Sequence, residues 1–216
     1  MVIESVTTKS GLQFPRGAND WKFMFSNVKK SASSSVSNAS LSTGIVSHAL
    51  SSLNRQGFLV VVFSNQGAIR NNVTGKKAMS VRTMMDDVFT TCMQSGSSVK
   101  ALDRYILMMA AQKDHFRKPE TGMFQYLNAL LEKLISSEIE QTTTCAPSND
   151  TVERDRAGMH SDMCIDLESS FFVGDAAGRP GDHSDSDSVF ARNVGFSHFF
   201  TPEEFFLHDK GNHLQL

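Results

Sequence analysis

Three polar residues each follow a short apolar run, and their side chains together could bind a phosphate group. They are Ser64, Lys118 and Asp175. A hydroxyl can hold phosphate oxygens, a lysine neutralises their charge, and an aspartate offers Mg²⁺ a hard oxygen ligand. Ligands of open parallel sheets bind at the carboxyl ends of the strands. The placement of these residues therefore favours a phosphate–magnesium site.

Each of these residues also has a purely structural interpretation. Ser64 could cap the N-terminus of a helix, Lys118 could be a solvated loop cation, and Asp175 could cap the helix that follows it. The single Gly-Lys pair, Gly75-Lys76, has no glycine five positions earlier and no Ser or Thr after it. The sequence therefore contains no phosphate-cradling P-loop of the kinase type.

A zinc site also has little support. The seven histidines are scattered, and no His-Glu-x-x-His motif occurs. His115 and His183 are the two that lie near the inferred phosphate site. Three widely spaced cysteines form neither a disulfide framework nor a zinc pattern, which indicates a reducing intracellular compartment.

The elements that must position the site are short strands alternating with amphipathic helices. The apolar runs are too short for helices and are bounded by polar or glycine-containing segments, which predicts buried strands at 58–63, 105–110 and 171–174. Apolar residues at helical spacing predict helices at 45–54, 78–93 and 120–135. This alternation is typical of an α/β fold with a parallel sheet and helices on its faces.

Length and composition predict one domain over residues 1–216. With 40% apolar and 20% charged residues, the chain can bury a core, which excludes wholesale disorder. Its longest apolar run, 58–63, is far shorter than the ~20 residues of a membrane helix. A serine-rich insertion at 31–43 and a flexible acidic loop at 138–168 are expected to interrupt the domain.

The net charge of −2 conceals two halves of opposite sign. Residues 1–135 hold 16 Lys and Arg against 8 Asp and Glu, a net charge of +8, whereas residues 136–216 hold 5 against 15, a net charge of −10. This asymmetry suggests a surface that faces a polyanion beside an acidic element. The alternative is that both halves are simply solvated faces.

Several motifs around the three strand ends are specific to one family. The strongest is Phe172-Val-Gly-Asp-Ala-Ala-Gly-Arg179, followed by Asp182-x-Ser184-x-x-Asp187-x-x-Phe190-Ala191-x-Asn193-x-Gly195 and Phe200-Thr-Pro-Glu-Glu-Phe-Phe206. Further matches are Val62-Phe-Ser-Asn-Gln66, Phe116-Arg-Lys-Pro-x-Thr-Gly-Met123 and Lys9-Ser-Gly11 with Phe14-Pro15 and Asp20-Trp21. With these motifs the chain resembles the 3′-phosphatase domain of polynucleotide kinase/3′-phosphatase, a branch of the haloacid dehalogenase superfamily.

The resemblance implies a three-layer sandwich with a central parallel sheet and a Mg²⁺-dependent reaction. In that reaction an aspartate attacks a 3′-phosphate at a DNA end, and water hydrolyses the resulting phosphoaspartate. Ser64 would bind the transferring phosphoryl group and Lys118 would stabilise charge. The metal site would be formed by Asp175 and the nearby acidic Asp187. The residues expected to contact the substrate are Asn65, Gln66, Arg70, Arg117 and Arg179. The resemblance further implies a monomer that acts on 3′-phosphate ends of nicks, gaps and breaks in nuclear DNA repair.

One departure from the family pattern puts catalysis by this chain in doubt. The family carries its nucleophile in an Asp-x-Asp-Gly-Thr motif at the end of the first strand, and no such motif occurs in this sequence. We therefore expect the chain to lack that strand and to be inactive or nearly so. We favour a start at an internal methionine, because losing a central strand would leave unpaired backbone groups that each cost roughly 1–3 kcal/mol. The alternatives are a non-catalytic module that binds DNA ends or a protein partner, and a fragment of a bifunctional kinase–phosphatase.

Overall fold

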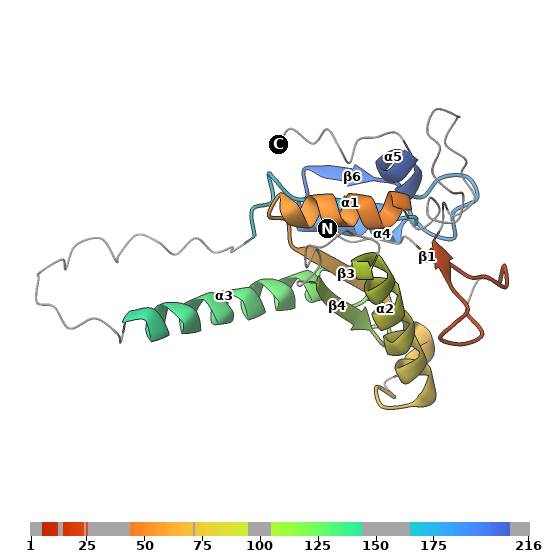
Figure 1. Ribbon diagram of the computed structural model, residues 1–216, viewed down its shortest axis with the longest axis horizontal. Coiled ribbons are helices and arrows are strands. Elements are labelled where there is room, and N and C mark those ends of the chain that lie inside the picture. The colour runs from red at the N-terminus through yellow and green to blue at the C-terminus, as the bar shows by residue number, and fades with distance from the viewer. Residues whose placement is uncertain are drawn as a thin grey trace, which may run out of the picture.

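A computed structural model describes residues 6–12, 15–23, 25, 44–70, 72–94, 105–143 and 165–207 (Figure 1). Its strands are β1 (Val6–Thr7), β2 (Lys22–Phe23), β3 (Val60–Asn65), β4 (Tyr105–Ala110), β5 (Phe171–Val173) and β6 (His198–Phe200). Its helices are α1 (Gly44–Arg55), the 3₁₀ helix η1 (Gly67–Ile69), α2 (Lys76–Gln94), α3 (Gly122–Thr143), α4 (Ser186–Val194) and α5 (Pro202–Leu207). None of the described helices is long and apolar enough to cross a membrane.

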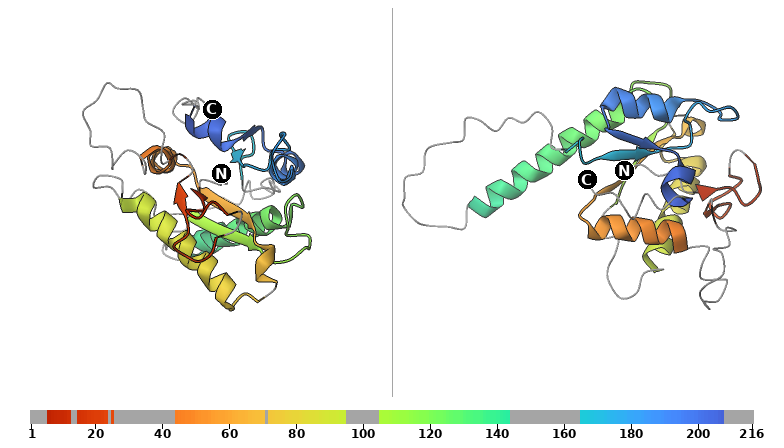
Figure 2. Two further views of the ribbon diagram at one scale, coloured as in Figure 1. Left: turned by 90° about the vertical axis from the view of Figure 1, so that its right-hand side faces the viewer. Right: turned by 90° about the horizontal axis from the view of Figure 1, so that it is seen from above.

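The strands form three two-stranded sheets. Strands β1 and β2 pair antiparallel, whereas β3 pairs parallel with β4 and β5 pairs parallel with β6. The β3–β4 and β5–β6 pairs are not hydrogen-bonded to each other and form separate sheets (Figure 2). The prediction of an α/β fold built on parallel strands is therefore confirmed at the level of small parallel sheets.

Alternating side chains of both parallel pairs enter the same two apolar clusters. One cluster takes Val60, Val62, Phe171 and Val173 from the strands and adds side chains of α1, α2 and α5. The other takes Val61, Phe63 and Phe172 and adds side chains of α3 and α4. Because successive strand residues point to opposite faces, β3 and β5 each separate one cluster from the other.

The chain after β6 shows how the local sequence starts a helix. The Thr201 amide and hydroxyl donate to the Glu204 carboxylate at 2.9 and 3.1 Å, and the Glu204 amide donates back to the Thr201 hydroxyl at 3.3 Å. This reciprocal arrangement is a capping box, and Pro202 occupies the first helical position, where its missing N–H costs nothing. Helix α5 is thereby set at the carboxyl end of β6.

The predicted elements are present, with shifted boundaries. Strand β3, expected at 58–63, begins two residues later and continues through Ser64 and Asn65. These two polar residues therefore lie within the strand. Helix α3 continues to Thr143, because residues 136–143 contain neither Gly nor Pro and include good helix formers. The expected flexible loop at 138–168 is therefore wrong for residues 138–143, and residues 144–164 lie outside the described residues. The serine-rich segment 31–43 lies outside the described residues.

Candidate functional site

Lys118 is held at the carboxyl end of β3 by the side chain of Asn65. The Asn65 Nδ2 donates to the Lys118 carbonyl at 3.0 Å, and the Lys118 amide donates to Asn65 Oδ1 at 2.9 Å. The next peptide carbonyl, that of Pro119, accepts from Asn193 Nδ2 of α4 at 3.1 Å. Two elements distant in sequence therefore fix the backbone that carries Lys118.

The Lys118 side chain is buried and forms an ion pair with Asp187. Lys118 is only 3% exposed and Asp187 only 1%, and Lys118 Nζ lies 2.6 Å from Asp187 Oδ1. The other carboxylate oxygen, Oδ2, accepts from the Ala176 amide at 3.1 Å. The interpretation of Lys118 as a solvated loop cation is therefore wrong.

Gly174 makes room for this ion pair. A Cβ atom on Gly174 would lie 2.6 Å from both Cβ and Oδ2 of Asp187, closer than real side chains approach. Asp187 stands in the first turn of α4, where its amide donates to the Ala176 carbonyl at 3.0 Å. The glycine between β5 and Asp175 thus lets α4 approach the end of the strand.

Asp175 and Ser64 occupy the corresponding ends of β5 and β3. Asp175 Oδ1 is buried and has no hydrogen-bond partner. The Ser64 hydroxyl accepts from Gln66 Nε2 at 2.9 Å, which leaves its own proton available to another acceptor. Neither residue caps a helix, because Ser64 lies in β3 and α4 begins only at Ser186, so both capping interpretations are wrong.

The contacts connect the three predicted site residues in one place. Asn65, which follows Ser64 in β3, binds the backbone of Lys118, and Lys118 pairs with Asp187 beside Gly174 and Asp175. The carboxyl ends of β3 and β5 therefore lie on the same side of the molecule, as the sequence pattern predicted.

The three predicted arginines differ in their surroundings. Arg70 is exposed and has a left-handed backbone at the end of η1. Arg117 is partly buried, and its Nη1 atom is buried without a hydrogen-bond partner. This Nη1 lies 3.0 Å from the position that a Cβ atom on Gly67 would occupy. Both are therefore cations beside the ends of β3 and β4 that an anionic ligand could use.

Arg179 is engaged with acidic side chains. Its guanidinium binds Asp182 at 3.0 Å and Glu203 at 3.1 Å, and Nη2 donates to the Asp175 carbonyl at 3.3 Å. The hydrogen bonds from Arg179 lower the pKa of Asp182, and those to Asp182 and Glu203 raise the pKa of Arg179. Arg179 thus braces the loop that follows Asp175.

The described residues contain no cluster of three His, Cys, Asp or Glu side chains suited to a metal ion. His115 is exposed and its ring lies 4.0 Å from that of Phe116, and His183 is also exposed. The buried Oδ1 of Asp175 fits a hard cation, because it has no hydrogen-bond partner, whereas Asp187 Oδ1 pairs with Lys118 and Asp187 Oδ2 accepts from the Ala176 amide.

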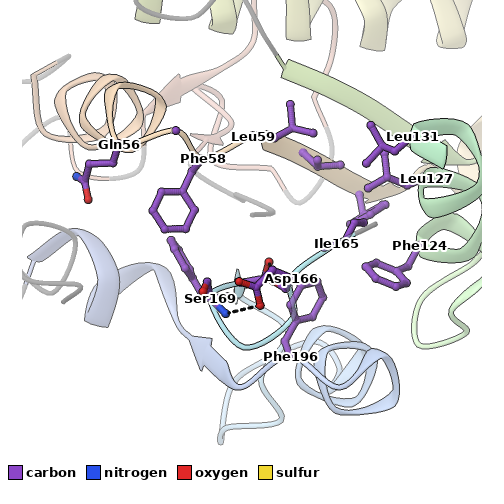
Figure 3. A pocket seen from close by; sticks show the side chains of 15 residues that line it. Gln56, Phe58, Leu59, Phe124, Leu127, Leu131, Ile165, Asp166, Ser169 and Phe196 are labelled. Carbon is purple, nitrogen blue, oxygen red and sulfur yellow. Dashed lines mark hydrogen bonds between the residues drawn. The ribbon is translucent and has the colours of Figure 1, made fainter. Parts of the chain in front are cut away.

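A separate apolar cavity lies at the amino ends of the strands. It has a volume of about 370 Å³ and is lined by side chains that include Leu59, Val61, Phe124, Leu127, Ile165 and Phe196 (Figure 3). At its rim, Asp166 accepts hydrogen bonds from the amides of Glu168 and Ser169. The cavity lies between β3, α3 and the segment leading into β5, away from Ser64, Lys118 and Asp175.

Comparison with known proteins decides the family. The model of the polynucleotide kinase 3 phosphatase family matches residues 5–155 and 144–206 of this chain. The chain belongs to this family. The resemblance inferred from the motifs is therefore confirmed.

Individual relatives of the chain carry names that agree with this family. It is 31% identical to the bifunctional polynucleotide phosphatase/kinase of Schizosaccharomyces pombe, over 94% of this chain and 35% of that protein. It is 29% identical to the polynucleotide 3′-phosphatase ZDP of Arabidopsis thaliana, over 88% of this chain and 21% of that protein. The polynucleotide 3′-phosphatase of Saccharomyces cerevisiae is 26% identical over 90% of this chain and 79% of its own length. The chain thus spans only about a third or less of the first two relatives.

Two residues of this chain, Gly174 and Asn193, have structural roles that the sequence analysis did not assign. Gly174 and Asn193 entered the sequence analysis only as members of the family motifs. Their functions depend on close approaches to Asp187 and to the Pro119 carbonyl, 13 and 74 residues away. Their place in the family motifs was the available signal, but it did not show what either residue contacts.

Proposed function

We propose that this chain is the phosphatase portion of a polynucleotide 3′-phosphatase that removes 3′-phosphates from DNA ends. Membership of the family supports the class of reaction. The observation that carries the proposal is the joining of the ends of β3 and β5 through Asn65, Lys118 and Asp187. A hydroxyl, an ammonium group and an unpartnered carboxylate oxygen at one edge would suit the binding of a phosphate with Mg²⁺, and this supports the proposal.

In this proposal each residue has a defined task. The Ser64 hydroxyl accepts from Gln66 and donates its proton to a phosphoryl oxygen. Lys118 contributes positive charge from a buried position, where water screens it less. Arg70 and Arg117 neutralise neighbouring phosphates of the DNA strand, whereas Arg179 keeps the loop after β5 in place. A DNA partner also accounts for the basic first part of the chain.

Mg²⁺ is the metal we propose, and Asp175 is the residue that would hold it. The buried Oδ1 of Asp175 lacks a hydrogen-bond partner, so a cation would satisfy it. Asp187 is paired with Lys118 and would act beside the metal through that lysine. When bound, Mg²⁺ would offset the negative charge of the phosphoryl group.

For the fold, we propose a haloacid dehalogenase-like three-layer sandwich whose central sheet is interrupted between β3 and β5. Both strands are fully buried along most of their length, yet in the described ranges each is hydrogen-bonded to one neighbour only. Both also contribute alternating side chains to the same two clusters. Buried strand edges normally find partners, which supports a strand position between the two.

The nucleophile is the part that this chain does not supply. In the family it stands in an Asp-x-Asp-Gly-Thr motif on the first strand, and the 216 residues contain no such motif. We propose that this strand fills the position between β3 and β5, and we expect the 216-residue chain alone to be inactive or nearly so.

An assay of 3′-phosphate release tests the proposal. The substrate is a nicked duplex with a 3′-phosphate, and the proteins are the 216-residue chain and the same chain with an N-terminal strand that ends in Asp-x-Asp-Gly-Thr. We expect Mg²⁺-dependent release only with the extension, and its loss in the extended Asp175→Ala variant. The matched control is the extension with both aspartates changed to asparagine. Strong turnover by the 216-residue chain, abolished by Asp175→Ala, would overturn the inference that this chain lacks its nucleophile. If every protein tested folds but none releases phosphate, the proposed phosphatase activity is overturned.

The second candidate function is a non-catalytic module that binds DNA ends or a protein partner. The absent nucleophile motif favours it, because Ser64, Lys118 and the arginines could still bind a phosphate. Tight binding of a 3′-phosphate duplex, with preference over a 3′-hydroxyl duplex and no turnover even with the extension, would support it. A third candidate is a fragment of a bifunctional kinase–phosphatase, the activity in the name of the Schizosaccharomyces pombe relative. For the main proposal we also propose action as a monomer in nuclear DNA repair.

A further inference from the structure

Asn65 makes two hydrogen bonds to a single residue 53 positions away. Its Nδ2 donates to the Lys118 carbonyl, and its Oδ1 accepts from the Lys118 amide, at 3.0 and 2.9 Å. A carboxamide carries a donor and an acceptor at its tip, so it can bind a peptide unit as a neighbouring strand would. An aspartate could make only the acceptor half of this contact, and an aliphatic side chain neither half.

This contact couples the two groups that would meet the phosphate. Asn65 is adjacent to Ser64 in β3, and Lys118 lies in the loop after β4. The Lys118 side chain extends into the interior, where Nζ lies 2.6 Å from Asp187 Oδ1 and 5.7 Å from the centre of the Phe172 ring. The place of the ammonium group relative to the Ser64 hydroxyl therefore depends on where the Lys118 backbone is held.

We propose that Asn65 is a positioning residue that fixes Lys118 relative to Ser64, and that it is not a substrate ligand. This inference rests on the proposed phosphate site and changes the role expected for Asn65, which was substrate contact. Both polar atoms of its amide are engaged with Lys118. Asn65 acts on the phosphate only through Lys118.

Chemical labelling of lysines tests this role without needing catalysis. The folded chain is treated with a trace of acetic anhydride, and the acetylation of Lys118 is measured by mass spectrometry relative to exposed Lys113. In the native chain Lys118 is protected because it is 3% exposed. We expect the Lys118-to-Lys113 ratio to rise at least tenfold in Asn65→Ala. We expect a smaller rise in Asn65→Asp, which keeps the acceptor of the Lys118 amide.

The matched control is Asn128→Ala, the same substitution at a part-buried asparagine whose amide donates to Glu132 at 2.7 Å on α3. It should leave the labelling ratio unchanged. An unchanged ratio in Asn65→Ala, or an equal rise at every lysine, would overturn the positioning role. Should Asn65→Ala fail to fold, the ratio in Asn65→Asp decides, and an unchanged value there refutes the inference.

Binding of inorganic phosphate separates this inference from the proposed function. With positioning, Asn65→Ala weakens phosphate binding together with the loss of Lys118 protection. Weakened binding with Lys118 still protected would make Asn65 a direct ligand and overturn the inference. If the native chain binds neither inorganic phosphate nor 3′-phosphate DNA, the proposed function fails, whereas the labelling ratio still reports whether Asn65 holds Lys118.

Discussion

The buried pair of Lys118 and Asp187 should dominate the effects of mutation at the site on stability. At 2.6 Å, Coulomb's law with an effective dielectric constant of about 20 gives an attraction of about 6 kcal/mol. Removing each ion from water costs several kcal/mol, so the pair adds little net stability. Removing one partner leaves the other charge buried, which costs about 3–5 kcal/mol.

These magnitudes predict a strongly non-additive mutant cycle. We expect Lys118→Met and Asp187→Asn each to lower the free energy of unfolding by about 3–5 kcal/mol. The double variant should lose less than the sum by at least about 2 kcal/mol, because no charge then remains uncompensated. The Asp187→Asn substitution keeps an oxygen that can accept from the Ala176 amide, so its effect reports mainly on the charge pair.

Urea denaturation followed by fluorescence measures these free energies. The chain has one tryptophan, Trp21, which is 8% exposed and whose Nε1 donates to Asp87 of α2 at 2.9 Å, so its emission reports on folding. A parallel cycle at the exposed Arg179–Asp182 pair should give a much smaller coupling. Additivity at Lys118 and Asp187 within about 0.5 kcal/mol would refute the reasoning, because it would mean that the two charges do not interact.

Three further results are expected. Gly174→Ala should destabilise the chain and expose Lys118 to acetylation, because the new Cβ would lie 2.6 Å from Asp187; an unchanged urea midpoint and labelling ratio would contradict this. Arg179 lowers the pKa of Asp182 from 3.8, so their contact stabilises the loop above about pH 4 and is lost as the pH falls through the lowered value. An NMR titration should show this shift in the native chain, and Arg179→Met should return the pKa towards 3.8. Finally, the N-terminal strand extension described above should raise the urea midpoint, and no change would contradict a strand position between β3 and β5.

The sequence was sufficient to locate the strands and the polar residues that follow them. Short apolar runs predicted β3, β4 and β5 within two residues at either end, because buried strands must be apolar on both faces. The end of α3 was misplaced because a polar, acidic stretch is compatible with both a loop and an exposed helix turn. The family was also visible in the sequence, since its motifs are long and sit at the strand ends.

The partners of the site residues could not be predicted in this way. Nothing in the local sequence shows that Lys118 is buried or that its ammonium group faces Asp187, because 69 residues separate them along the chain. The same holds for Asn65, whose neighbours suggested substrate contact and whose amide instead holds the Lys118 backbone. These contacts arise only when the loop after β4 meets the end of β3 and the first turn of α4.

What the sequence predicts and what only the folded structure decides differ in whether they depend on residues close together or far apart along the chain. Strand and helix patterns, charge distribution and family motifs are local properties, and they are readable in the 216 residues without coordinates. Which carboxylate is paired and which is left unsatisfied depends on distances of about 3 Å between segments far apart in sequence. Only the folded chain sets those distances, and it leaves Asp175 Oδ1 without a partner while Asp187 neutralises Lys118.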